Sequence, residues 1–139
     1  QMCIRDRATG YYDTSYENKA KFGLRALEDH DLVFIHVEAP DEAGHAGDIE
    51  RKIEAIENLD RRLIKKILDG LKDEYAISIL ADHPTPIEER VHVPDPVPFA
   101  IYSTKGGRDD VENFDELSAS KGAFGVLEGH KFMDKLLRP

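Results

Sequence analysis

The sequence is poor in cysteine and has no long apolar run, and each shortage excludes a class of protein. Cys3 is the only cysteine in the 139 residues, so the chain forms no internal disulfide and no thiolate-rich zinc site. The longest apolar candidate, residues 32–37, is far shorter than the roughly 20 residues that cross a bilayer. We therefore expect a cytoplasmic protein with no membrane partner.

Basic side chains are also scarce relative to acidic ones. The chain has 19 Lys and Arg against 28 Asp and Glu, which gives a net charge of −9. Such a surface repels a phosphate backbone on average, so we expect no nucleic-acid partner. The acidic excess fits a solubility surface, and it equally fits carboxylates gathered to hold cations. Composition leaves both interpretations open.

The remaining composition is typical of one soluble globular domain, with 40% hydrophobic and 34% charged residues. The first seven residues, QMCIRDR, show neither a helix nor a strand period, and they contain no apolar core of a secretory signal. We interpret residues 1–7 as a non-native leader that packs against nothing. Residues 8–139 are predicted to form the folded part.

Three segments show the 3.6-residue period of amphipathic helices. Ser15 stands directly before the first segment and Asp48 is the first residue of the second, and both are good N-caps. The third segment is broken around Gly129. The predicted helices cover residues 16–28, 48–68 and 119–137.

Three β-branched runs predict buried strands, and the loop 38–47 is marked by Pro40, Gly44 and Gly47. Strands that alternate with helices predict an α/β fold with a mostly parallel sheet flanked by helices. An average sheet has about 5–6 strands, so this sheet is predicted to be partial, with strands missing most simply on its N-terminal side. The predicted strands cover residues 32–37, 76–81 and 98–103.

Two groups of possible metal ligands follow predicted strands, at the sheet edge where α/β proteins bind ligands. Asp41 and His45 are four residues apart, so one helical turn brings them to the same side. Asp82 and His83 directly follow the predicted strand 76–81, and His92 lies in the loop beyond them. Mixed Asp and His ligands suit Mn²⁺ or Zn²⁺ better than Ca²⁺.

Each group by itself has an ordinary explanation. An Asp and a His four apart are usually a solvated helix pair, and an Asp at a strand end is commonly a turn or cap residue. Together, and with a third histidine nearby, they support the hypothesis of a metal site.

Long, ordered motifs then extend this hypothesis through a resemblance. The chain is similar to archaeal-type cofactor-independent phosphoglycerate mutases of the alkaline phosphatase superfamily, from about residue 8 to its end. The resembling segments are residues 10–14, HVEAPDEAGHAGD (36–48), ADHPTP (81–86), DPVPFAIY (95–102) and SKGAFGVLEGHKFMDKLL (120–137).

The resemblance implies a C-terminal fragment of an alkaline-phosphatase-like, metal-binding domain. Family members interconvert 3-phosphoglycerate and 2-phosphoglycerate in glycolysis or gluconeogenesis, through a phosphoserine and two divalent metals, without 2,3-bisphosphoglycerate. Mn²⁺, Mg²⁺, Co²⁺ and Zn²⁺ are all consistent with it. The small-molecule substrate is then phosphoglycerate, while the oligomeric state stays open.

The resemblance also implies a role for each candidate ligand. Asp41, His45 and His92 match the positions that hold one metal, and Asp82 with His83 match half of the second site. The family completes that second site with an early Asp and the nucleophilic Ser. No serine here matches the nucleophile, so the sequence supplies no catalytic residue of that kind, and we expect the chain alone to be inactive.

Two other residues, His36 and Glu38, are candidates to orient a ligand histidine. His30 and His130 are better explained as surface or cap histidines. Two alternatives remain: another phosphatase or phosphomutase of the same superfamily, or a non-enzymatic α/β module with ordinary surface Asp and His. The second alternative predicts that Asp41, His45 and His92 do not converge.

Overall fold

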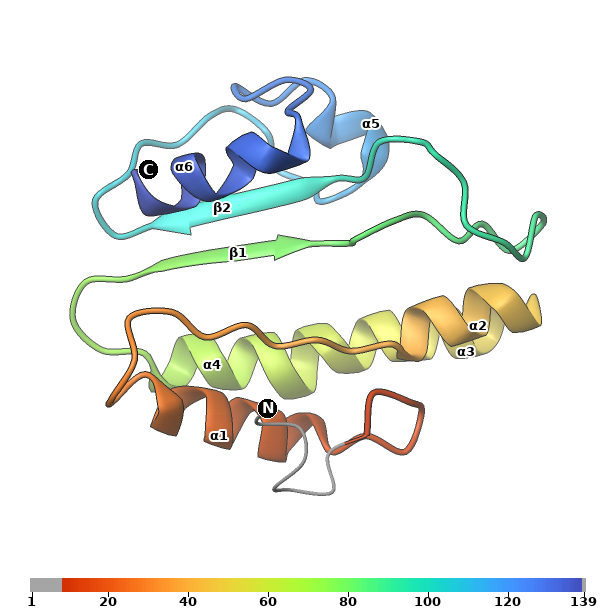
Figure 1. Cartoon of the computed structure of the whole chain (residues 1–139), viewed down its shortest axis with the longest axis horizontal. Helices are drawn as coiled ribbons and strands as arrows, with labels where there is room; N and C mark the ends of the chain where they lie inside the picture. Colours follow the sequence, from red (N-terminus) through yellow and green to blue (C-terminus); the bar gives the residue numbers. More distant parts are fainter. Residues whose placement is uncertain (1–8, 139) are drawn as a thin grey trace. The chain divides into compact units, whose positions relative to one another are not determined.

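The computed structural model describes residues 9–138 and divides the chain into two compact units (Figure 1). The first unit comprises the chain up to residue 71 together with residues 85–92. The second comprises residues 72–84 and residues 93 onward. The predicted leader, residues 1–7, lies outside the described residues.

The first unit opens with helix α1, Tyr16–Ala26, which confirms the first predicted helix. Ser15 adopts an extended conformation, and its side chain accepts a hydrogen bond from the backbone N–H of Asn18 at 3.3 Å. This satisfies one of the N–H groups that a helix leaves unpaired at its start. Figure 1 shows α1 packed alongside the later helix α4.

The second predicted helix is also confirmed, but it is not uniform. It comprises α3 (Ile49–Asn58), the π-helical segment η2 (Leu59–Ile64) and α4 (Lys65–Gly70). The carboxylate of Asp48 accepts a hydrogen bond from the backbone N–H of Arg51 at 3.0 Å and so caps the run. The π-helical segment was not predicted, because a hydrophobic period does not reveal one wide turn.

The core of the first unit lies between α1 and this helical run. Tyr16, Ala20 and Leu63 are buried together, and only 2% of the surface of Tyr16 is exposed to solvent. The guanidinium of Arg62 lies 5.1 Å from the centre of the Tyr16 ring. Partly buried side chains that complete this core are Ile35, Val37, Leu59 and Ile67.

The prediction of a loop at residues 38–47 is wrong, because most of it forms helix α2, Ala39–Ala46. Pro40 lies in the first turn, where its missing N–H costs nothing. Gly47 ends the helix with φ 69°, the left-handed conformation that favours glycine. Proline at the start and glycine at the end mark the boundaries of a short helix here.

The prediction of a strand at residues 32–37 is also wrong, since this segment pairs with no strand in the part of the chain that the structure describes. The predicted burial is present on one side of the segment only. Ile35 and Val37 pack against the core, whereas Leu32 and Phe34 are exposed. An apolar, β-branched run predicts an extended segment with buried side chains, but a strand also needs a hydrogen-bonded partner.

The second unit contains strands β1 (Ala76–Leu80) and β2 (Phe99–Ser103), close to two predicted strands. They pair antiparallel, with Ala76 opposite Ser103 and Leu80 opposite Phe99. The expected mostly parallel sheet is therefore not confirmed within residues 9–138. A parallel pair needs a crossover, usually a helix, and no helix separates β1 from β2.

Three short helical segments follow this pair in the described part of the chain. They are α5 (Glu116–Ala119), the 3₁₀ turn η3 (Gly129–Lys131) and α6 (Phe132–Leu137), and α6 contacts β1. The ring of Phe99 meets the rings of Phe124 and Phe132, with centroids 6.0 and 5.5 Å away. The predicted helix 119–137 is thus interrupted, with α6 following Gly129. No helix in residues 9–138 is long and apolar enough to cross a membrane.

Candidate metal centre

Helix α2 presents the first two candidate ligands from consecutive turns. Asp41 lies in the first turn, where the positive end of the helix dipole favours a carboxylate. His45 lies one turn later on the same side. Its Nε2 atom is 3.4 Å from Oδ2 of Asp41. The predicted pairing through one helical turn is therefore present.

The segment 85–92, which belongs to the same unit, brings the third candidate ligand. Nε2 of His92 lies 3.4 Å from Oδ1 of Asp41 and 3.0 Å from Nε2 of His45. All three side chains are part-exposed. The structure thus brings together Asp41, His45 and His92, whereas the non-enzymatic alternative predicted that these residues do not converge.

The spacing of these atoms fits a shared divalent cation. Bonds of about 2.0–2.1 Å to nitrogen or oxygen separate neighbouring ligand atoms by roughly 2.8–3.4 Å in octahedral and tetrahedral sites. The three separations fall in this range, with His45 facing Oδ2 of Asp41 and His92 facing Oδ1. Two imidazole nitrogens 3.0 Å apart either share a proton or both face a cation.

A backbone carbonyl fixes the tautomer of His45. Nδ1 of His45 lies 2.9 Å from the carbonyl oxygen of Arg90. Because a carbonyl only accepts, Nδ1 carries the proton, and the lone pair of neutral His45 is on Nε2. Arg90 turns its carbonyl toward the ring from a left-handed conformation, φ 57°.

A buried hydroxyl contacts Asp41. Thr85 retains 4% of its exposed surface, and its Oγ1 donates a hydrogen bond to Oδ1 of Asp41. Sequence reasoning found neither Thr85 nor Arg90. Thr85 stands inside the segment ADHPTP, but no spacing rule identifies a hydroxyl or a carbonyl that acts on a neighbour.

Close backbone contact holds segment 85–92 against α2. A Cβ atom on Gly44 would lie 2.5 Å from the carbonyl oxygen of Thr85, so only glycine fits there without a shift. The same carbonyl accepts a hydrogen bond from Nζ of Lys52 at 2.6 Å. A Cβ atom on Gly47 would meet the guanidinium of Arg90 at 2.5 Å.

Asp82 and His83 follow β1 and belong to the second unit. The backbone N–H of His83 donates to Oδ1 of Asp82 at 3.1 Å, and Nδ1 of His83 lies 3.6 Å from the same oxygen. Their position directly after a strand is as predicted. Their role as ligands of a second metal stays a prediction.

The other sequence candidates have local partners. Nε2 of His36 lies 3.9 Å from Oε1 of Glu38. The carboxylate of Glu38 lies beside Gly10, where a Cβ atom would be 2.9 Å away. The orienting role predicted for His36 and Glu38 stays a prediction. His30 Nδ1 bonds the carbonyl of Ala26 at 3.0 Å, which confirms a cap, and His130 is exposed beside Glu128 at 3.8 Å.

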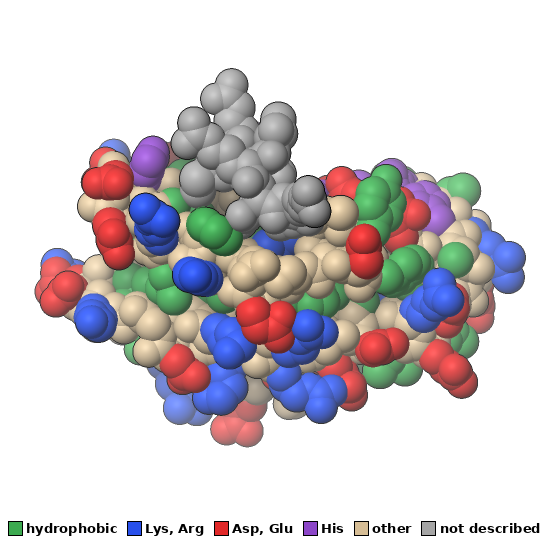
Figure 2. Space-filling view, turned by 90° about the horizontal axis from the view of Figure 1, so that it is seen from below, with side chains coloured by type: hydrophobic (Ala, Val, Ile, Leu, Met, Phe, Trp, Pro, Cys, Tyr) green, Lys and Arg blue, Asp and Glu red, His purple; other side chains and the backbone are tan. Residues whose placement is uncertain are grey.

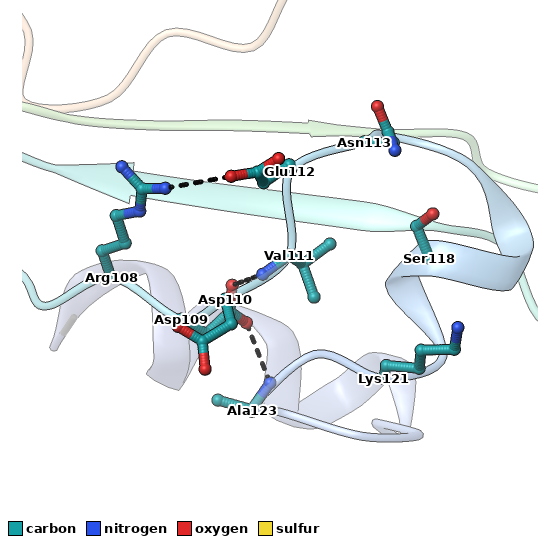
Figure 3. Close-up of a pocket in the computed structure, with 9 residues that line it drawn as sticks. All are labelled: Arg108, Asp109, Asp110, Val111, Glu112, Asn113, Ser118, Lys121 and Ala123. Carbon is teal, nitrogen blue, oxygen red and sulfur yellow. Dashed lines mark hydrogen bonds and ion pairs between the residues drawn. The ribbon is translucent and has the colours of Figure 1, made fainter.

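A hollow of about 590 Å³ in the second unit has a different lining (Figure 3). One lining side chain is Asp109, whose carboxylate accepts hydrogen bonds from the backbone N–H groups of Val111 at 3.1 Å and Ala123 at 2.9 Å. These bonds lower the pKa of Asp109. Asp109 therefore acts as a turn-forming group, and none of the five predicted ligands lines the hollow.

Charges on the surface are mixed in sign, as the face in Figure 2 shows. The guanidinium of Arg62 binds both carboxylate oxygens of Glu17, at 2.6 and 3.0 Å. These hydrogen bonds lower the pKa of Glu17 to about 2, and the same pair raises the pKa of Arg62. Burial raises the pKa of the Tyr16 hydroxyl beneath them. The pair joins α1 to η2 over the core.

Nearly the whole chain is similar in sequence to known proteins. Residues 6–139 match the sequence profile of the Metalloenzyme superfamily. The 2,3-bisphosphoglycerate-independent phosphoglycerate mutase 2 of Methanothermobacter thermautotrophicus is 50% identical over 133 residues, which cover 95% of this chain and 33% of the relative. The 2,3-bisphosphoglycerate-independent phosphoglycerate mutase of Methanosarcina mazei is 47% identical, with 94% and 34% covered.

A solved structure agrees with these matches. The PH0037 protein from Pyrococcus horikoshii superposes with a TM-score of 0.91 at 39% sequence identity. The match covers 95% of this chain and 40% of that protein. The chain spans about a third of the length of the curated relatives it matches.

Proposed function

This chain belongs to the Metalloenzyme superfamily, and we propose on that basis that it is a metal-binding part of a cofactor-independent phosphoglycerate mutase. Curated relatives at 43–50% identity carry that name, which confirms the resemblance found in the sequence. The proposed reaction interconverts 3-phosphoglycerate and 2-phosphoglycerate. It would serve glycolysis or gluconeogenesis in the cytoplasm.

One observation carries the proposal: ligand atoms of Asp41, His45 and His92 lie 3.0–3.4 Å apart within one unit. A carboxylate and two imidazoles form the mixed oxygen and nitrogen set that suits Mn²⁺, Co²⁺ or Zn²⁺, and Mg²⁺ less well. A divalent ion held there would place positive charge beside a phosphoryl oxygen and lower the pKa of a bound hydroxyl.

The chain's own residues have separate tasks in this proposal. Asp41 contributes a negative charge through either oxygen, and His45 offers Nε2 because Nδ1 is committed to a carbonyl. His92 closes the set from the neighbouring segment. The part-exposed side chains leave the site open to a phosphorylated substrate.

We assign Asp82 and His83 to a second divalent ion. The proposed reaction proceeds through a phosphoserine, and no serine in this chain matches the family's nucleophile. The proposed enzyme needs no 2,3-bisphosphoglycerate. The 139-residue chain by itself is expected to lack mutase activity.

A chimera tests the activity. Residues 8–139 would replace the matching third of the Methanothermobacter thermautotrophicus relative, which is 50% identical. We expect the purified chimera to convert 3-phosphoglycerate to 2-phosphoglycerate with added Mn²⁺ and without 2,3-bisphosphoglycerate. The variant Asp41→Asn in the chimera removes the carboxylate and should abolish this conversion, whereas Asp134→Asn, outside the candidate site, should not.

Two results would contradict the proposal. One is a folded, metal-loaded chimera that hydrolyses phosphate esters but forms no 2-phosphoglycerate, which favours a phosphatase of the same superfamily. The other is an Asp41→Asn chimera with full mutase activity, since that outcome removes Asp41 from the metal site.

A further inference from the structure

Thr85 is one of few polar side chains buried in the described part of the chain. Its exposed fraction is 4%, and its hydroxyl donates to Oδ1 of Asp41. That same oxygen lies 3.4 Å from Nε2 of His92. One carboxylate oxygen therefore meets both a fixed hydroxyl donor and a candidate ligand.

Thr85 is itself held at its backbone. Its carbonyl accepts a hydrogen bond from Nζ of Lys52 at 2.6 Å, and this ties it to α3. The absence of a side chain at Gly44 lets the same carbonyl approach α2 closely. The hydroxyl of Thr85 thus projects from a backbone that two helices fix.

A carboxylate on a helix rotates among several orientations, and only some direct its oxygens at a common point with His45 and His92. A hydroxyl donor on Oδ1 selects among those orientations. Because Thr85 is buried, water competes weakly for this hydrogen bond, and the low local polarity strengthens it. The bond is also charge-assisted, since Asp41 accepts as a carboxylate.

We propose that Thr85 is a positioning residue that orients the Asp41 carboxylate toward the bound divalent ion. This inference rests on the proposed function, because it needs an ion at Asp41. Thr85 does not contact the ion in this proposal. Its effect passes through Asp41, so its loss weakens binding and changes the geometry of the bound ion.

The alternative is that Thr85 only stabilises segment 85–92. Three variants of the 139-residue chain separate these roles. Thr85→Val keeps the shape and removes the hydroxyl, while Thr85→Ser keeps the hydroxyl. Thr14→Val is the matched control, because Thr14 is also 4% exposed and donates its hydroxyl to the carbonyl of Thr9, away from Asp41.

Each chain would be stripped of metal and titrated with Mn²⁺ by calorimetry, and the absorption spectrum with Co²⁺ would report ligand geometry. We expect Thr85→Val to weaken Mn²⁺ binding about 10–100-fold, the range for lost outer hydrogen bonds to ligands, and to change the Co²⁺ spectrum. Thr85→Ser should restore both. The melting temperature without metal should change about as much in Thr85→Val as in Thr14→Val.

The outcomes are distinguishable. If the unsubstituted chain binds Mn²⁺ and Thr85→Val binds it equally well, the positioning role is wrong and the metal site stands. If Thr14→Val weakens binding as much, or Thr85→Ser fails to restore it, the effect is general destabilisation and the inference is wrong. If the unsubstituted chain binds neither Mn²⁺ nor Co²⁺, the proposed metal site is wrong, and this inference is wrong with it.

Discussion

Asp41 occupies the centre of the candidate site, because each of its two oxygens faces a different histidine. Oδ2 lies 3.4 Å from His45 and Oδ1 lies 3.4 Å from His92. The two histidines come from separate segments of the chain, one helical and one irregular. Removal of either histidine would leave two ligands, which hold a divalent ion far less tightly than three.

We expect His92→Ala to weaken Mn²⁺ binding by more than about 100-fold, since loss of a direct ligand exceeds the effect of lost outer contacts. His130→Ala is the matched control, because His130 is an exposed histidine beside Glu128. Calorimetric titration of the metal-free chains measures both. Equal Mn²⁺ affinity for His92→Ala and the unsubstituted chain would exclude His92 as a ligand.

The pair of Glu17 and Arg62 predicts an acid sensitivity. The folded-state pKa of Glu17 is about 2, below its ordinary value of 4.5. The stabilisation is therefore complete above pH 4.5 and is lost as pH falls from 4.5 towards 2. It amounts to at most about 1 kcal/mol, because both side chains are more than a third exposed and water screens the pair.

Glu17→Gln should accordingly lower the free energy of unfolding at pH 7 and leave it almost unchanged near pH 2. Urea denaturation at both values measures this difference. Glu57→Gln is the control, since Glu57 pairs with Arg61 within one stretch of helix and does not join α1 to η2. An equal loss for Glu17→Gln at both pH values would contradict the assignment.

The sequence predicted those site residues whose side-chain type and spacing are typical of metal ligands. Asp41 and His45 stand four apart, and His92 lies in the loop beyond Asp82 and His83; the resemblance then assigned His92 to the same metal as Asp41 and His45. Thr85 and Arg90 act through a hydroxyl and a backbone carbonyl. Neither group leaves a pattern in one sequence, because almost any segment contains them.

At the scale of elements, α2 depends on how its ends are formed. Pro40 stands in the first turn, and Gly47 closes the last turn in a left-handed conformation. Both residues usually interrupt helices, and for that reason the pattern indicated a loop. Their position at the ends, with Pro first and Gly last, is the arrangement that short helices favour.

Gly47→Ala is expected to destabilise the chain by about 1–2 kcal/mol, the cost of a left-handed conformation for a residue with a Cβ. It should also displace Arg90, whose guanidinium occupies the space of the new methyl group. Gly107→Ala is the control, because nothing lies within 4 Å of a Cβ there. Thermal unfolding of both variants measures the difference, and equal melting temperatures would contradict it.

The direction in which β1 and β2 pair could not be predicted from the sequence, for a physical reason. Short apolar runs rich in β-branched residues predicted β1 and β2 within about a residue of their ends. Such a run indicates a buried extended segment and carries no information on the direction of a neighbouring strand. The same limit explains residues 32–37, whose side chains alternate without a partner strand in the described range 9–138.

For the whole molecule, metal binding should couple to stability. An ion that binds only the folded chain adds about 2.7 kcal/mol at a concentration of 100 times its Kd. We expect Mn²⁺ to raise the melting temperature of the unsubstituted chain and a chelator to reverse the change. In Asp41→Asn the same addition should have little effect, and an equal rise in that variant would place the stabilising ion elsewhere.

The chain passes between its two units more than once, and this limits how the protein can be divided into pieces. Segment 85–92 belongs to the first unit, although the residues on either side of it belong to the second. A gene cut after residue 71 would therefore separate Asp41 and His45 from His92. No single cut yields both units intact, and the three candidate ligands stay together only in a piece of the chain that spans residues 41–92.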